Sequence, residues 1–201
     1  MAFGNQEYQN YLQISNMISL LEMQAPDLMM EHAAFMQSLE RAGLLNRRVE
    51  FLPDDDQIQQ RLKLQKGLTR PELSLIISYG KLTYTKALLA SKLPDNPALV
   101  DWAVAYFPEK LQKKYRAEIE GHQLRREMIA MSISNAVVNR MGPTFVRMTS
   151  EKTGCSIADV TEAFMVVRDS FGLQKLWSAI EMLDNKVSAK VQLRALLKTS
   201  R

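Results

Sequence analysis

The twelve residues from Met128 to Asn139 contain no charged side chain, and they constrain the fold more than any other part of the chain. Most of them are Met, Ile, Val or Ala, so nearly the whole circumference of a helix formed here is apolar or small. Such a helix is surrounded by protein rather than lying on a surface. The stretch is too short to cross a bilayer, which needs roughly 20 apolar residues. We therefore predict a buried helix at the centre of an all-α protein.

The residues on either side define the ends of this helix. Charged residues precede it at Arg125–Glu127, and Arg140 stands in its last turn, where a cation interacts favourably with the helix dipole. Gly142 and Pro143 then end it, because Gly adopts the capping conformation and Pro does not continue a helix. We place the central helix at about residues 122–141 and predict a multi-helix bundle of about ten helices around it.

Two capping signatures mark the starts of further helices. Thr69 is followed by Pro71 and Glu72, and Ser156 is followed by Asp159, which are the spacings of capping boxes. Apolar residues recur at helical spacing between Gly and Pro punctuation through the rest of the chain. The other helices are predicted within residues 8–23, 26–43, 53–67, 69–91, 96–107, 108–121, 143–153, 156–172, 173–183 and 188–201.

We predict two parts of the chain, an N-terminal helical hairpin with its connector at residues 1–52 and a C-terminal helical bundle domain at residues 53–201. In the connector, Val49 and Phe51 alternate with charged residues, which favours a short extended segment within residues 44–52. In the predicted helix at residues 108–121, the spacing directs Leu111, Tyr115 and Ile119 inward.

The net charge is +4, and it is unevenly distributed. Residues 1–60 hold three Lys/Arg and nine Asp/Glu, whereas residues 61–201 hold 23 Lys/Arg and 13 Asp/Glu. A basic region binds nucleic acid through charge alone, but here the basic residues are interspersed with acids along helices, which is typical of solvated faces. We expect no nucleic-acid partner and no membrane partner. One cysteine and no recognisable signal peptide indicate a cytoplasmic protein.

No familiar catalytic motif is present in the sequence: there is no Gly-rich phosphate loop after a strand, no His pair at metal spacing and no nucleophile elbow. We interpret His32 and His122 as surface or helix-end residues and Cys155 as an inert thiol in a turn. The three acids at residues 54–56 are interpreted as first-turn residues that favour the helix dipole rather than as metal ligands. We therefore expect no catalytic residue and no metal site.

Polar residues inside the central helix are the best candidates for a binding role. Ser132, Asn135 and Asn139 share one stripe of an otherwise apolar segment, and buried amides need partners. One interpretation is that they bond to neighbouring helices and keep them in register. The other is that the stripe faces an inter-domain or ligand surface, formed by Arg125, Arg126, Ser132, Asn135, Asn139, Arg140 and Thr144.

Several motifs in this chain resemble those of the large bacterial NAD-specific glutamate dehydrogenases, in their C-terminal helical region. The resemblance extends over nearly the whole chain and is weakest before Leu39. The motifs are Gly67–Leu73, Tyr79–Lys81, Leu88–Asp95, Leu124–Ala130, Val138–Phe145, Thr153–Gly154 and Leu183–Asn185.

The resemblance implies that the chain is part of a much longer polypeptide. The family oxidises L-glutamate to 2-oxoglutarate and ammonium with reduction of NAD, as homo-oligomers, in amino-acid catabolism. The family's catalytic residues and dinucleotide fold lie upstream, so no catalytic or cofactor-binding residue is carried over to this chain, and NAD is implied for the parent enzyme only. The implied partners are the upstream catalytic dehydrogenase domain and other subunits.

Two roles for such a region stay open. It limits closure of the nucleotide-binding domain, or it forms subunit contacts. The competing class is a self-contained α-helical adaptor or nucleic-acid-binding protein, against which stands the lack of a concentrated basic stripe with interleaved aromatic residues.

Overall fold

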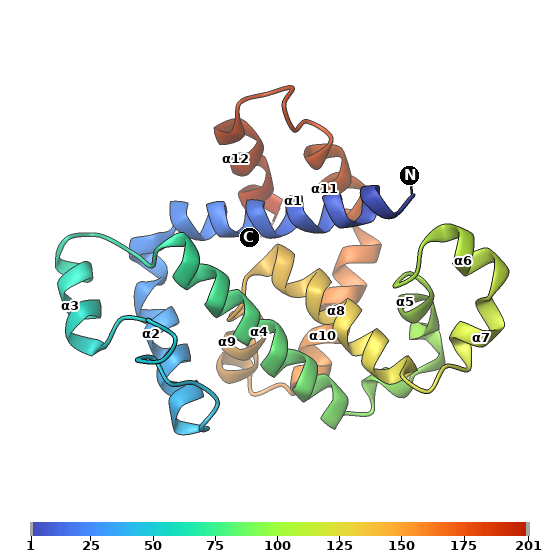
Figure 1. Ribbon diagram of the computed structural model, residues 1–201, viewed down its shortest axis with the longest axis horizontal. Helices are drawn as coiled ribbons and strands as arrows, with labels where there is room; N and C mark the ends of the chain where they lie inside the picture. Colours follow the sequence, from blue (N-terminus) through green and yellow to red (C-terminus); the bar gives the residue numbers. More distant parts are fainter. Residues whose placement is uncertain (1, 200–201) are drawn as a thin grey trace.

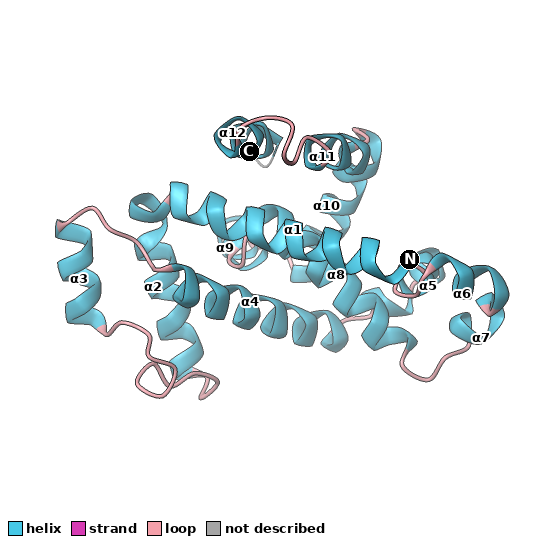
Figure 2. Ribbon diagram, turned by 45° about the horizontal axis from the view of Figure 1, so that its top comes forward, coloured by secondary structure: helices cyan, strands magenta, loops and turns pink. Residues whose placement is uncertain are grey.

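The protein is all-α, as predicted. The computed structural model describes residues 2–199, with side chains from residue 11 onward. Within residues 2–199 there are twelve α-helices, two short 3-10 helices and no strand (Figures 1 and 2). The helices are α1 (Ala2–Met23), α2 (Ala25–Arg41), α3 (Asp55–Lys63), α4 (Arg70–Ala90), α5 (Val100–Val104), α6 (Glu109–Lys114), α7 (Arg116–Glu120), α8 (Arg125–Met141), α9 (Phe145–Thr153), α10 (Ile157–Ser170), α11 (Leu173–Glu181) and α12 (Ala189–Thr199), with 3-10 turns at Leu93–Asp95 and Pro97–Leu99.

The predicted central helix is α8. It packs against α1, α4 and α5, and its inward residues include Ile129, Ile133 and Val137, which are almost completely buried. It begins at Arg125 rather than near 122, because His122–Leu124 form a turn in which His122 Nδ1 accepts a hydrogen bond from the Leu124 amide at 3.1 Å. Gly142 ends it with φ +93°, a backbone conformation that favours glycine. In Figure 1, α8 lies beside α4 and crosses in front of α10.

The crossing of α4 and the end of α8 depends on a glycine. A Cβ atom placed on Gly80 would lie 2.7 Å from Pro143 Cβ and 2.8 Å from the Pro143 carbonyl oxygen. No real Cβ is tolerated that close to backbone atoms, so the two segments approach to a distance that only glycine permits.

The capping signatures are formed as predicted. The Thr69 amide donates to Glu72 Oε2 at 2.7 Å at the start of α4, and Ser156 and Asp159 form the reciprocal bonds at the start of α10. These bonds satisfy amides that the first helical turn leaves without partners. At Asp54 the first of the three consecutive acids also caps a helix, in a capping box with Gln57.

The helical hairpin of α1 and α2 is present, and α1 also contacts α4, α8 and α12. In Figure 1, α1 runs across the molecule between α8 and the α11–α12 pair, and Figure 2 shows the same order after rotation. Segments from both ends of the sequence therefore pack together, and the division at residue 52 stays a prediction. No helix within residues 2–199 combines the length and apolarity that spanning a bilayer requires.

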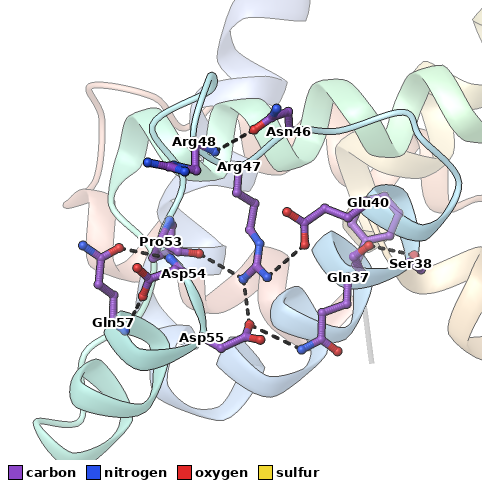
Figure 3. Close-up of polar contacts among 11 residues, drawn as sticks. Gln37, Ser38, Glu40, Asn46, Arg47, Arg48, Pro53, Asp54, Asp55 and Gln57 are labelled. Atoms are coloured by element: carbon purple, nitrogen blue, oxygen red, sulfur yellow. Dashed lines mark hydrogen bonds and ion pairs between the residues drawn. The ribbon is translucent and has the colours of Figure 1, made fainter.

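The extended segment predicted within residues 44–52 is wrong. These residues form turns, and Arg47 holds them in place with ion pairs to Glu40 at 2.9 Å and Asp55 at 2.8 Å and a hydrogen bond to the Pro53 carbonyl oxygen (Figure 3). Phe51 is exposed and has φ +54°. Alternating polarity misled the prediction because a strand needs a partner for its backbone, whereas side-chain bonds satisfy this segment locally.

Two further predictions about burial are also wrong. The predicted helix at residues 108–121 is broken at Tyr115 into α6 and α7, so Leu111 and Tyr115 are exposed and only Ile119 is buried. His32, predicted at the surface, is 1% exposed on the inner face of α2. Helical periodicity places residues on a face, but the neighbouring helices decide whether that face is covered. His122, in contrast, is exposed as predicted.

Candidate functional site: a polar groove along α8

Four of the seven residues predicted to form a surface lie in one groove, namely Ser132, Asn135, Asn139 and Arg140. Its volume is about 690 Å³, within the range of small-molecule sites. Side chains from α1, α8, α10 and α11, and from α5 and the turn after it, line it. The lining is Gln13, Trp102, Ala105, Tyr106, Pro108, Met131, Ser132, Asn135, Ala136, Asn139, Arg140, Arg168, Gln174 and Trp177.

Arg140 is the most deeply buried charge of the groove. Its side chain is 6% exposed and forms an ion pair with Glu181 of α11 at 2.5 Å. Glu181 Oε1 makes no aligned hydrogen bond in this contact, so the pair is held by charge. The guanidinium also lies 5.0 Å from the centroid of the Trp177 ring, a cation–π contact. Arg140 therefore joins α8 to α11 in addition to lining the groove.

Asn139 and Arg140 each keep one buried polar atom without a hydrogen bond. Asn139 donates from Nδ2 to Gln13 Oε1 at 3.4 Å, but its Oδ1 has no partner among the described residues, and neither has Arg140 Nη2. Such unsatisfied atoms are rare in folded proteins, and each of them is free to bond to water, an ion or a ligand. Ser132 and Asn135, which are half-buried, show no side-chain hydrogen bond to any residue from 11 to 199.

Arg168 of α10, another residue of the lining, covers Trp102. Its guanidinium lies 4.5 Å from the centroid of the Trp102 ring, and it forms an ion pair with Asp169 at 2.7 Å. The Asp169 side chain is largely exposed, so this pair contributes little to stability. Trp102, Arg168 and Trp177 were not predicted as groove residues, because nothing in the local sequence pattern indicates that α5, α10 and α11 converge on α8.

The other three predicted residues, Arg125, Arg126 and Thr144, do not line the groove. Arg125 Nη1 donates to the Glu120 carbonyl oxygen at 3.2 Å. Arg126 forms an ion pair with Asp95 and donates from Nη2 to the Leu89 carbonyl oxygen at 2.9 Å. These bonds attach the start of α8 to the end of α7, to the 3-10 turn at Leu93–Asp95 and to the end of α4.

The third residue, Thr144, is buried and forms a hydrogen bond with Glu31 of α2. It lines a different cavity, of about 470 Å³, between α1, α2 and the α8–α9 connection. Thr144 therefore follows the predicted stripe in sequence but not in space, because the chain turns at Gly142.

Groups with strongly shifted pKa values lie outside the groove. Burial lowers the pKa of Lys81 to about 8 and that of His32 to about 4, and burial raises the pKa of Tyr84, whose hydroxyl is 2.7 Å from that of Thr161. No group of three His, Cys, Asp or Glu residues at metal-binding distance occurs in the described part of the chain. Cys155 is an exposed free thiol before α10.

Comparison with known proteins yields a family and close relatives. The family model described as "Glutamate dehydrogenase, C-terminal" matches residues 65–201. The NAD-specific glutamate dehydrogenase of Halomonas elongata is 39% identical over 188 residues, or 94% of this chain and 12% of the relative. That of Pseudomonas aeruginosa is 40% identical over 193 residues, or 96% and 12%. That of Mycobacterium tuberculosis is 31% identical over 156 residues, or 78% and 10%.

These matches confirm the resemblance that the motifs carry. The chain spans about 12% of the length of the first two relatives.

Proposed function

The chain belongs to the family of C-terminal regions of glutamate dehydrogenases, and on this premise we propose that it is the helical, non-catalytic C-terminal region of a much larger NAD-specific enzyme. The reaction proposed for the whole enzyme is oxidation of L-glutamate, with NAD and water, to 2-oxoglutarate, ammonium and NADH. The region acts in assembly or regulation of that enzyme, and its partners are the catalytic dehydrogenase domain and further subunits.

The chemistry of the groove along α8 is the observation that supports this proposal. Its lining offers guanidinium, amide and hydroxyl groups and aromatic rings, and the lining residues that the structure describes include no carboxylate, histidine, cysteine or lysine. A hydroxyl such as that of Ser132 or Tyr106 is a weak nucleophile until a neighbouring general base activates it, and carboxylate, histidine and lysine are the usual bases. The groove is therefore suited to binding and not to turnover.

The residues of this chain do not fit NAD. Dinucleotide sites of the usual kind place the pyrophosphate at a helix N-terminus that follows a β-strand and a Gly-rich turn. Residues 2–199 contain no strand, and no Gly-x-Gly-x-x-Gly motif occurs in the sequence. We assign NAD binding to the part of the enzyme outside this chain.

The first experiment deletes from the full enzyme the region that corresponds to this 201-residue chain, and it measures both oligomer size and glutamate oxidation. Truncation at residue 122 is less informative, because it removes α8 and exposes the apolar faces of α4 and α5. A region that forms subunit contacts is expected to change the oligomer size when removed. A region that limits domain closure is expected to change kcat or KM at constant oligomer size. Unchanged size and kinetics together would refute the proposal.

The second experiment uses the 201-residue chain alone. We expect no glutamate-dependent reduction of NAD and no heat of NAD binding in a calorimetric titration. Clear turnover by this chain would contradict the assignment of catalysis to the rest of the enzyme.

A further inference from the structure

We propose that the groove along α8 binds a small organic oxyanion, a carboxylate or phosphate carried by a molecule with an apolar or planar body. This inference goes beyond the proposed function, because it concerns what the groove itself recognises. Its test does not involve dehydrogenase activity, so its failure and that of the proposed function are distinguishable.

The charge of the lining selects an anion. Arg140 and Arg168 line the groove, and among the side chains of residues 11–199 that line it there is no Asp or Glu. The acids that pair with these arginines, Glu181 and Asp169, do not belong to the lining. A groove whose charged walls are of one sign concentrates ligands of the opposite sign.

Arg168 is the residue we assign to the oxyanion. Its ion pair with the exposed Asp169 side chain is weak in water, so an incoming carboxylate or phosphate is able to share or replace it. Guanidinium binds planar oxyanions through two parallel hydrogen bonds, and Trp102 beneath the guanidinium holds its plane in place. Arg140 is less available, since it is buried in its pair with Glu181.

Neutral groups around Arg168 provide further contacts. Ser132 and Asn135 lie in the same lining with side chains that are unbonded to residues 11–199, and each offers a donor. Tyr106 and Trp102 supply rings against which an apolar or planar body packs. The volume of about 690 Å³ exceeds that of a bare phosphate or carboxylate, which is why we infer a body in addition to the charged group.

The molecule carries its own reporter for the test. The sequence contains two tryptophans, Trp102 and Trp177, and both line the groove. Tryptophan fluorescence of the 201-residue chain is measured during titration with inorganic phosphate, succinate or AMP, against sodium chloride at the same ionic strength. We expect a saturable change with at least one of these probes. A response to inorganic phosphate indicates that the groove recognises a phosphate group, and a response to succinate indicates that it recognises a carboxylate. A response to AMP alone indicates that it recognises a phosphate together with a stacked ring.

Substitutions locate the bound anion. Arg168→Gln is expected to weaken binding about 10-fold or more, because a charged hydrogen bond is lost. Asn135→Ala is a second variant, on another helix, and is expected to weaken binding to a smaller extent. Arg147→Gln is the matched control: Arg147 also forms an ion pair, with Glu151, and lies over an aromatic ring, Phe35, but it is not part of the groove.

Three results would overturn the inference. The first is the absence of any saturable response beyond that of chloride with all three probes, the result expected if a segment of the longer polypeptide fills the groove instead. The second is an unchanged affinity in both Arg168→Gln and Asn135→Ala, with thermal unfolding by circular dichroism showing folded variants. The third is an equal loss of affinity in Arg147→Gln.

Discussion

Acid should destabilise this fold through one residue, His32. The imidazole is 1% exposed on α2, and neither ring nitrogen has a hydrogen-bond partner among the described residues. Burial disfavours the imidazolium and lowers the pKa of His32 from 6.5 to about 4, although the nearby Glu31 charge opposes this change. His32 is therefore neutral in the folded protein at pH 7.

The sign and size of the effect follow from linkage. The unfolded chain binds a proton at His32 near pH 6.5, whereas the folded chain does so only near pH 4. The contribution of neutral His32 to the free energy of unfolding is therefore fully present above about pH 6.5, and it is lost as the pH decreases toward 4. The difference between the two pKa values corresponds to about 3 kcal/mol, of which about 2 kcal/mol is lost by pH 5. Proteins are stable by only about 5–15 kcal/mol, so this is a large fraction.

The assay is urea unfolding at pH 7.5 and pH 5 for the wild type and for His32→Leu and His32→Gln. Stability of the wild type is expected to decrease by about 2 kcal/mol more than that of either variant over this interval. Carboxylates with lowered pKa values, such as that of Asp159, are common to all the proteins and cancel in the comparison. The exposed His122 gives the control, and His122→Gln is expected to behave like the wild type. Parallel losses in the wild type and both His32 variants would refute the reasoning.

Three more outcomes are expected from urea unfolding at pH 7.5. Gly80→Ala should lower the free energy of unfolding by about 1–3 kcal/mol, because the added Cβ meets the Pro143 backbone. Gly121→Ala is the control and should not lower it, since its Cβ lies 3.5 Å from the nearest atom. Equal stability of the two variants would contradict the close crossing. Arg140→Met and Glu181→Met should each lower the free energy of unfolding by about 3–5 kcal/mol, because each leaves a buried charge without its partner, and the double variant should lower it much less. Additive losses in the double variant would show that the two groups are not coupled. Ser156→Ala should cost about 1 kcal/mol through loss of the cap on α10, and no change would argue against that cap.

Local signals in the sequence determined most of the secondary structure. Capping residues such as Thr69 and Ser156 act within four residues, and helical periodicity repeats within a single helix, so both are visible without knowledge of the fold. The length of the uncharged stretch likewise predicted burial of α8, because no surface helix lacks a polar face. The fold class and the family resemblance were therefore available from the residues alone.

Only the tertiary structure decided what covers each face. His32 is buried because other helices cover its face of α2, whereas no helix within residues 2–199 covers Tyr115. Helical spacing alone does not distinguish a covered face from an uncovered one. The groove required Trp102, Arg168 and Trp177 to meet the α8 stripe from three other segments. Side chains far apart in sequence come together through packing of whole helices, and that packing depends on complementary surfaces rather than on any local pattern.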